Sequence, residues 1–451
     1  MLGRVLLLLF LFGLHRASAA DIDYCTPAPV GSYVEPLRFL TAEKAQYIAQ
    51  AFGTPIYVYS MDKLQTQAQA ALNFPNAYGL TVRFAMKSSS NAAILQTFHK
   101  MGLNIDASSV TEIARAVRAG FAPDQISLST QDLADGFEEW VEKGVKINAC
   151  SLDQLERYGR AFPGTSIGVR FNPGIGSGGT NKTNVGGPAS SFGIWYEWMP
   201  QVKALLAKYS LTCNRVHTHI GSGSDPAVWV RAANLTLGLV AQLPDVSTVN
   251  LGGGYKVARV ATEHSTDLQV VGKPVRDAFV EFYRNYGRML HLEIEPGTFL
   301  LANSASLITS VRDIVSTGST GYNFVKLNAG YPEIIRPSLY GAQHPLVTIP
   351  SKPNPRVCSY VVVGHTCESG DLLTPLPNEG SALGARPMQE VQLGDLVVVE
   401  GVGAYCASMS TINYNSHLQA PEAMLLTDGK VALIRKKQTF EQLLQNEVPL
   451  P

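Results

Sequence analysis

Between residues 64 and 303, short apolar runs that end in polar residues alternate with stretches that have the apolar spacing of helices. Eight strand-like runs alternating with helices over about 240 residues predict a (β/α)8 barrel, in which parallel strands form the inner wall. A doubly wound open sheet is the alternative with the same alternation. The eight runs are 82–87, 103–106, 126–129, 146–149, 167–171, 215–220, 247–251 and 290–294.

The pattern changes after residue 304, where short β-branched runs lie between turns rich in glycine and proline. The runs Leu307–Val311, Tyr360–Val363 and Leu396–Val399 are typical of strands and predict an all-β domain. The run Ile56–Tyr59 is also strand-like, and we expect it to join that domain. The predicted domains are therefore a barrel at 61–303 and a discontinuous β domain formed by 20–60 and 304–451.

Residues 1–19 have the composition of a secretory signal peptide. Arg4 precedes an apolar run, and Ala17-Ser18-Ala19 supplies the small residues of a cleavage site. No later run reaches the roughly 18 apolar residues that a spanning helix needs, so no stable membrane span is expected after cleavage. We expect entry into the secretory pathway, towards an outer compartment or a plastid reached through the endoplasmic reticulum.

The charge balance argues against a nucleic-acid partner. Lys+Arg and Asp+Glu number 36 each, the net charge is zero, and only 16% of residues are charged. No basic patch is expected, and small-molecule chemistry becomes the default. The six cysteines include no C-x-x-C pair, so the sequence suggests neither a zinc site nor a disulfide framework.

Lys87 closes the first predicted barrel strand and is followed by Ser88-Ser89-Ser90. Catalytic groups of such barrels lie at the C-terminal ends of the strands. A lysine that loses solvent there is expected to have a lowered pKa, as an amine nucleophile or Schiff-base lysine needs. The ordinary alternative is a surface lysine at a strand end.

Three other strand ends carry candidate groups. The turn Gly252–Gly254 exposes backbone N–H groups and suits a phosphate. His217 and His219 share one face, and no carboxylate or cysteine completes a metal set, so His217 is expected to be a core residue and His219 to stack on a flat cofactor. Glu293 and Glu295 also share a face, and a carboxylate at the barrel mouth can hold a pyridinium N–H.

Cys367 lies between glycine turns in the predicted β domain, next to Glu368 and close to Asp371. This polar, exposed setting differs from that of a buried structural thiol. The neighbouring acids favour the protonated thiol, so Cys367 suits a proton donor better than a thiolate.

Seven motifs in order along the chain resemble those of the fold-type III pyridoxal-phosphate decarboxylases. The resemblance is closest to the diaminopimelate decarboxylase group and the related D-lysine/D-ornithine decarboxylases, and it extends from about Pro55 to Leu426. The motifs are RFAMK, HTHIGS, LGGGY, EPG, IRPSLYGAQH, CESGD and GAYCASMSTINYNS.

The resemblance implies pyridoxal 5'-phosphate as the cofactor and an alanine racemase-like architecture of barrel plus β domain. It also implies a head-to-tail homodimer with shared active sites, in which the cysteine loop of one subunit enters the site of the other. The implied catalytic residues are Lys87 as the Schiff-base lysine, His219 as the stacking residue and Cys367 as the proton donor. The implied cofactor-binding residues are Lys87, His219, Ser222, Gly252, Gly253, Gly254, Glu295, Gly297 and Tyr405. The implied substrate-binding residues are Arg336, Tyr340, Glu368 and Tyr405.

The implied reaction is decarboxylation of a basic amino acid at its D-configured centre, with meso-diaminopimelate giving L-lysine as the first choice. Thr298 stands where the family usually has an arginine that binds the distal carboxylate. A D-lysine/D-ornithine decarboxylase giving cadaverine or putrescine is therefore an alternative, whereas Glu368 favours diaminopimelate. An alanine racemase-like enzyme would not carry the CESGD and GGG motifs. A catalytically inactive regulatory homologue is a further alternative, although such proteins tend to lose the lysine or the cysteine, and Lys87 and Cys367 are both present.

Overall fold

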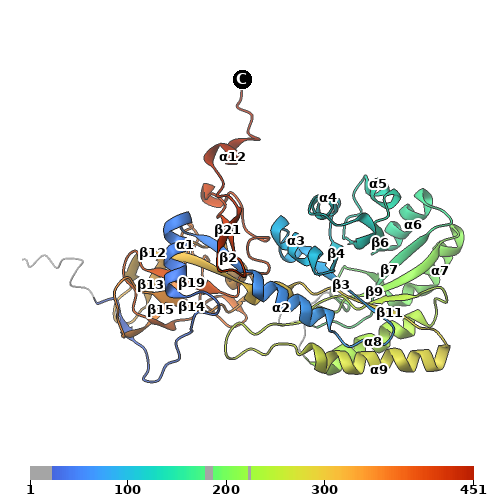
Figure 1. The fold of residues 1–451 in the computed structure, drawn as a ribbon, viewed down its shortest axis with the longest axis horizontal. Helices are drawn as coiled ribbons and strands as arrows, with labels where there is room; N and C mark the ends of the chain where they lie inside the picture. Colours follow the sequence, from blue (N-terminus) through green and yellow to red (C-terminus); the bar gives the residue numbers. More distant parts are fainter. Residues whose placement is uncertain (1–22, 178–185, 222–224) are drawn as a thin grey trace, which may run out of the picture.

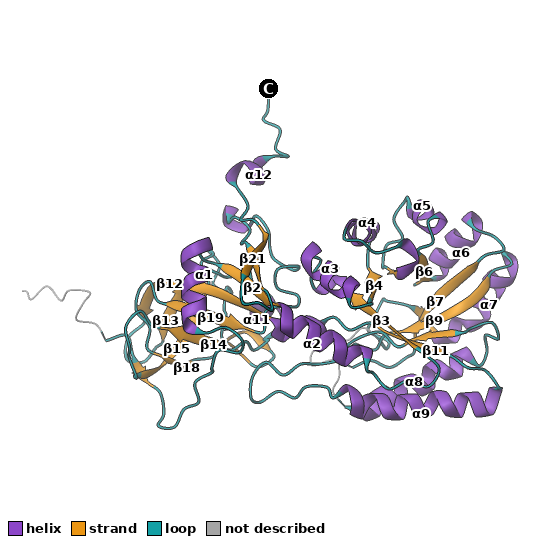
Figure 2. Ribbon diagram, in the orientation of Figure 1, coloured by secondary structure: helices purple, strands orange, loops and turns teal. Residues whose placement is uncertain are grey.

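The structure is a computed structural model that describes residues 23–177, 186–221 and 225–451. The predicted signal peptide and Ser222 lie outside these residues. Figures 1 and 2 show two domains side by side, one with strands lying between helices and one dominated by strands. None of the described helices combines the length and apolar character needed to cross a membrane.

The barrel is closed by strand pairing around the full ring. Its strands follow the order β6-β5-β4-β3-β11-β10-β9-β7, and β6 also pairs with β7. This closure excludes the open-sheet alternative. The barrel strands are β3 (Leu80–Ala85), β4 (Asn104–Ala107), β5 (Ile126–Ser129), β6 (Lys146–Ala149), β7 (Ser166–Asn172), β9 (Thr212–Thr218), β10 (Thr248–Asn250) and β11 (His291–Ile294), with the short β8 (Ile194–Trp195) beside β7.

Helices follow most of the barrel strands, and polar side chains cap the first turns of several of these helices. Asn91, Ser109 and Ser151 each accept a hydrogen bond from a backbone N–H of the helix that they start. The helices then bury one apolar face against the strands. The helices around the barrel are α2 (Met61–Leu72), which precedes β3, and α3 (Ala92–Lys100), α4 (Val110–Arg118), α5 (Phe137–Glu142), α6 (Leu152–Ala161), α7 (Met199–Lys208), α8 (Pro226–Val240) and α9 (Leu268–Tyr286).

The second domain is built on a ten-stranded mixed sheet. Strand β2 lies inside it, antiparallel to β12 and parallel to β20, so the chain enters this sheet before it forms the barrel and returns to it afterwards. The strands are β1 (Thr26–Pro27), β2 (Ile56–Ser60), β12 (Ala305–Ser316), β13 (Asn323–Leu327), β14 (Leu346–Ile349), β15 (Val357–Val363), β18 (Arg386–Gln389), β19 (Leu396–Glu400), β20 (Glu422–Leu425) and β21 (Val431–Arg435).

Smaller elements complete this part of the molecule. A separate hairpin is formed by β16 (Pro375–Leu376) and β17 (Glu379–Leu383). The remaining helices are α1 (Ala42–Phe52), α10 (Thr298–Leu301), α11 (Arg336–Tyr340) and α12 (Phe440–Leu444). Helix α12 and the C-terminus extend away from both domains in Figure 1.

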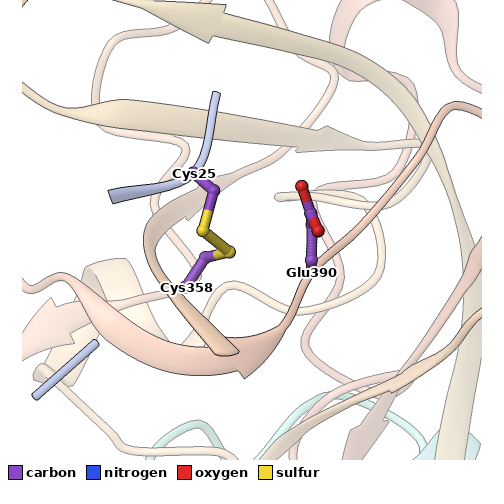
Figure 3. A group of neighbouring side chains, drawn as sticks. All are labelled: Cys25, Cys358 and Glu390. Atoms are coloured by element: carbon purple, nitrogen blue, oxygen red, sulfur yellow. A yellow bond between two sulfur atoms is a disulfide. The ribbon is translucent and has the colours of Figure 1, made fainter. Parts of the chain in front are cut away.

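A disulfide joins Cys25 to Cys358, with 5.2 Å between their Cα atoms (Figure 3). Strand β1 pairs with β15 and brings the two thiols together across a sequence separation of 333 residues. The cysteine spacing did not predict this disulfide, because pairing at this sequence separation depends on how the strands of the sheet align and not on the local sequence. Glu390 lies beside the disulfide in Figure 3, but bonded sulfurs are not thiolate ligands for a metal.

Candidate active site

A cavity of about 590 Å³ lies between the two domains, at the C-terminal ends of the barrel strands. Both domains line it. The barrel contributes Lys87, His219, Gly253, Gly254, Glu295 and Gly297, and the β domain contributes Arg336, Tyr340 and Tyr405. The cavity thus gathers most of the site residues that the sequence predicted, from six separate segments of the chain.

Lys87 lies in a single 3-10 turn, Met86–Ser88, directly after β3 rather than in the strand itself. Its Nζ is 3.7 Å from Oδ2 of Asp106, and 37% of its side chain is exposed. Burial would lower the pKa of Lys87, but Asp106, Tyr405 and Glu295 outweigh it and raise the pKa above the ordinary value. The expected lowering of this pKa is therefore wrong in this state of the site, because the sequence pattern did not reveal the acids around the amine.

Asp106 is almost completely buried at the end of β4, and its Oδ1 has no hydrogen-bond partner. Burial and the nearby Glu295 raise the pKa of Asp106 well above its ordinary value. The positive charge of Lys87 acts against this rise, because it favours the ionised Asp106 carboxylate.

Glu295 follows β11 and is held from below by side chains of neighbouring strands. Nδ2 of Asn250 donates to its Oε1 at 2.6 Å, and Nε2 of His217 lies 3.2 Å from its Oε2. Burial alone would raise the pKa of Glu295, but His217 and Lys87 outweigh it and hold the pKa below the usual range. An ionised carboxylate therefore points towards the cavity.

His217 is a buried residue of the barrel interior, as the sequence predicted. Its Nδ1 lies 3.3 Å from Oγ of Ser129, opposite its contact with Glu295. Burial lowers the pKa of His217, and burial together with Arg170 and Lys87 lowers the pKa of His219 well below the ordinary value. His219 is therefore neutral, and its Nδ1 has no hydrogen-bond partner.

The glycine turn after β10 leaves space for the side chain of His219. A Cβ at Gly252, where φ is +69°, would lie 2.7 Å from Nδ1 of His219, and a Cβ at Gly253 would lie 2.1 Å from the carbonyl oxygen of Glu295. Only glycine allows this close approach. The turn brings the backbone of residues 252–254, the His219 ring and the segment after β11 to one wall of the cavity.

Tyr405 connects the β domain to the lysine turn. Its backbone N–H donates to the carbonyl oxygen of Ser88 at 2.9 Å, and the Ser408 hydroxyl donates to the same oxygen at 2.9 Å. Tyr405 has a φ of +57°, and a Cβ at Gly297 would lie 3.2 Å from its hydroxyl oxygen. The β domain thus fixes the position of the segment that carries Lys87.

Cys367 and Glu368 are exposed on a loop of the β domain and do not line the cavity of their own chain. The backbone N–H of Cys367 donates to Oδ1 of Asn415 at 2.7 Å, which fixes this loop against the segment after Tyr405. The structure therefore does not bring these two residues together with Lys87 within one chain.

Arg170 and the position of Asp106 beside the lysine were not predicted from the sequence. Arg170 lies in β7, lines the cavity, and is 3.5 Å above the ring of Phe192. Its only sequence signal was a charged residue inside an otherwise apolar barrel strand.

The fold and the site define a pyridoxal-phosphate-dependent enzyme with a barrel and a β domain. Residues 61–302 match the pyridoxal binding domain of the pyridoxal-dependent decarboxylases. The chain belongs to this decarboxylase family.

The chain is 36% identical to the diaminopimelate decarboxylase of Escherichia coli K12, over 91% of this chain and 97% of that protein. It is 34% identical to the diaminopimelate decarboxylase of Streptomyces coelicolor, over 89% and 90% of the two chains. A crystal structure of diaminopimelate decarboxylase has a TM-score of 0.83 with 35% identity, and covers 90% of this chain and 96% of that one. The Helicobacter pylori enzyme complexed with L-lysine has a TM-score of 0.78 with 27% identity, over 89% and 98%.

The residues present fit the cofactor of this family. The Lys87 amine is open to the cavity, the glycine turn exposes backbone N–H groups, and the ionised Glu295 carboxylate faces the same space. The neutral His219 ring, with its unpartnered Nδ1, forms part of the same wall.

Proposed function

We propose that this enzyme decarboxylates meso-diaminopimelate at its D-configured centre and releases L-lysine and CO₂. The observation that carries the proposal is a cavity that combines Lys87, the Glu295 carboxylate and the Gly252–Gly254 turn. The chain that forms it is 36% identical to a diaminopimelate decarboxylase, and the match covers 97% of that relative. The L-lysine complex of the Helicobacter pylori relative supports the same product.

When bound, pyridoxal phosphate supplies an electron sink for the charge that remains on Cα after CO₂ leaves. In this proposal Lys87 holds the cofactor covalently, and Glu295 accepts the hydrogen bond of the ring N–H and keeps that nitrogen protonated. Asn250 and His217 keep Glu295 in place. His219 covers one face of the ring, and a charged imidazole there would oppose the protonated ring nitrogen.

In the same proposal, the phosphate of the cofactor is bound by the backbone of Gly252–Gly254, together with Gly297, Tyr405 and Ser222. Backbone N–H groups of a glycine turn bind anions without steric hindrance from a Cβ. Tyr340 and Arg336 line the same cavity, and in this proposal they contact the side chain of the substrate.

We propose that Cys367 and Glu368 complete the cavity of a second copy of this chain in a homodimer. Their exposure and their absence from the cavity of their own chain support this arrangement. Ile412 and Tyr414, on the segment that holds the cysteine loop, are 52% and 37% exposed, which favours a contact surface. In this arrangement Cys367 donates the proton to Cα, and Glu368 pairs with the distal ammonium of the substrate.

The alternative is decarboxylation of D-lysine or D-ornithine, which lack the distal carboxylate. The neutral Thr298 in the cavity lining favours it, because no guanidinium is available from that position. The experiment is CO₂ release by the enzyme loaded with pyridoxal phosphate, with the three amino acids offered separately. The proposal predicts the highest kcat/KM for meso-diaminopimelate, and a preference for either D-monocarboxylic amino acid would overturn it.

We propose further that the chain enters the secretory pathway through residues 1–19. The Cys25–Cys358 disulfide supports this route, because disulfides persist in oxidising compartments and are rare in the cytosol. Fusion of residues 1–30 to a fluorescent reporter tests it. A reporter that remains entirely in the cytosol would refute the proposal.

A further inference from the structure

Arg259 lies in the loop between the glycine turn and α9, and its side chain lines the active-site cavity. The residue is only 6% exposed. Nε donates to the carbonyl oxygen of Gly401 at 2.9 Å, whereas Nη2 is buried without a hydrogen-bond partner. The loop is fixed by the backbone N–H of Arg259, which donates to Oε2 of Glu263 at 2.7 Å.

Arg336 begins α11 and lines the same cavity from the β domain. Its Nε is also buried without a hydrogen-bond partner, and its guanidinium lies 5.6 Å from the centre of the Tyr340 ring. Within the described ranges, no carboxylate forms an ion pair with Arg259 or Arg336. Both guanidinium groups therefore keep unused donors at the cavity.

The two cations act on each other. Burial and the charge of Arg336 lower the pKa of Arg259 to about 9, and the nearby acid Glu263 does not compensate. Lys256 and His264 line the cavity as well and add no negative charge. Two neighbouring like charges, each with a buried donor that has no hydrogen-bond partner, are costly unless an anion joins them. A carboxylate matches the planar guanidinium donors.

We infer that Arg259 and Arg336 together bind the carboxylate at the end of the substrate that is not decarboxylated, and that Arg259 selects a dicarboxylic amino acid. The inference rests on the proposed function. Thr298 belongs to the same lining and is too short to occupy this place. Arg259 thus supplies, from a different loop, the guanidinium that position 298 lacks.

The first test compares the kcat/KM of wild type and Arg259→Gln for meso-diaminopimelate and D-lysine. Loss of one partner of a buried charged contact costs about 2 kcal/mol or more, so the kcat/KM for diaminopimelate is expected to fall about 30-fold or more. The value for D-lysine, which has no distal carboxylate, is expected to stay within about twofold of wild type. Arg276→Gln, on the exposed face of α9, is the matched control that leaves both values unchanged. An equal fall for the two substrates would overturn the inference.

The second test measures binding and does not depend on turnover. Calorimetric titration of the loaded enzyme with L-lysine and with cadaverine compares two diamines that differ in one carboxylate. The wild type is expected to prefer L-lysine, and Arg259→Gln is expected to lose that preference. This measurement separates the inference from the proposed function. If the enzyme did not turn over diaminopimelate but still preferred L-lysine to cadaverine in a way that depends on Arg259, only the proposed function would be refuted.

Two further variants address folding and the cofactor. Arg259→Lys keeps the charge and is expected to retain part of the preference, and Thr298→Arg in the Arg259→Gln background is expected to restore it. The Kd for pyridoxal phosphate, followed by absorbance, is expected to be unchanged. Weaker cofactor binding with an unchanged substrate preference would assign Arg259 to the phosphate and overturn the inference.

Discussion

At the level of single residues, the charge of Glu295 depends on groups beneath it and beside it in the barrel mouth. Asn250 and His217 contact one carboxylate oxygen each, and Lys87 lies across the cavity. The carboxylate is therefore ionised before the cofactor binds. Because a neutral amide cannot keep the ring nitrogen protonated, this residue provides a direct test of the proposed chemistry.

Replacing Glu295 with glutamine is expected to lower kcat by about 100-fold or more, the size typical of losing a positioned proton-transfer partner. The absorbance spectrum of the bound cofactor should change as well, because the protonation of its ring nitrogen changes. Steady-state kinetics and the spectrum check this. The exposed Asp277→Asn serves as a control, and wild-type kcat in Glu295→Gln would contradict the assignment.

Glu293 is a second buried carboxylate, on the floor of the barrel. It lies 2.7 Å from Nη2 of Arg83 and 3.2 Å from Nε of Arg215. Burial raises its pKa, but the two arginines outweigh burial and lower the pKa to about 2. A lowered pKa in the folded state stabilises the protein above the unfolded value near 4.5, and this contribution is lost as pH falls from about 4.5 to about 2.

The free energy of unfolding is therefore expected to fall by about 3 kcal/mol across this pH range because of Glu293. Glu293→Gln is expected to destabilise the protein at pH 7 by about 3–5 kcal/mol, since it leaves two buried cations without their carboxylate. Denaturant unfolding of both proteins at several pH values checks this. If the free energy of unfolding of Glu293→Gln fell with pH as steeply as that of the wild type in this acid range, groups other than Glu293 would cause the loss of stability.

At the level of elements, the turn after β10 controls the position of His219. Gly252→Ala is expected to weaken pyridoxal phosphate binding about tenfold or more, because the new Cβ forces His219 out of place and adds strain at φ +69°. Gly429→Ala is the matched control: its φ is +80° and nothing lies within 4 Å of an added Cβ. Equal cofactor affinity in the two variants would remove the steric argument.

The alternation of strands and helices was sufficient to predict the barrel, because each of the eight strands is an apolar run that ends in polar residues. The polar ends of the strands led directly to Lys87, His219, the glycine turn and Glu295. Arg170 was missed because a single charged residue in a strand is also typical of an exposed face. The pKa of Lys87 was predicted in the wrong direction, since it depends on Asp106 and Tyr405, whose approach is set by the closed ring and the second domain.

At the level of the whole molecule, the proposed dimer can be tested by subunit mixing. Lys87→Ala and Cys367→Ala are each expected to be nearly inactive, and Lys87→Ala is expected to lack the visible band of the lysine-bound cofactor. Mixed after dissociation, they are expected to recover about one quarter of wild-type activity, because half of the dimers are mixed and each has one intact site. No recovery in a verified mixed dimer would place Lys87 and Cys367 in the same subunit.

The disulfide fixes the N-terminal segment to the β domain. Reduction, or the Cys25→Ser/Cys358→Ser double variant, is expected to lower the free energy of unfolding by about 2–5 kcal/mol. Denaturant melts with and without dithiothreitol measure this. The double variant should not respond to the reductant. The pairing was not readable from the sequence, because it arises from the alignment of β1 with β15.

The position of β2 has a consequence for the newly made chain. All five residues of this strand are buried between β12 and β20, yet β12 is synthesised roughly 250 residues later and β20 roughly 360 residues later. At about 5–20 residues per second, an apolar strand edge stays unpaired for about 10–50 seconds while the whole barrel is made. The barrel can close during this interval, but the cavity wall that contains Tyr405 cannot form, because that part of the chain has not yet been made. A chain that ends before residue 305 therefore carries a barrel whose preceding apolar strand has no β12 or β20 to pair with, and such an edge is prone to pair with other chains.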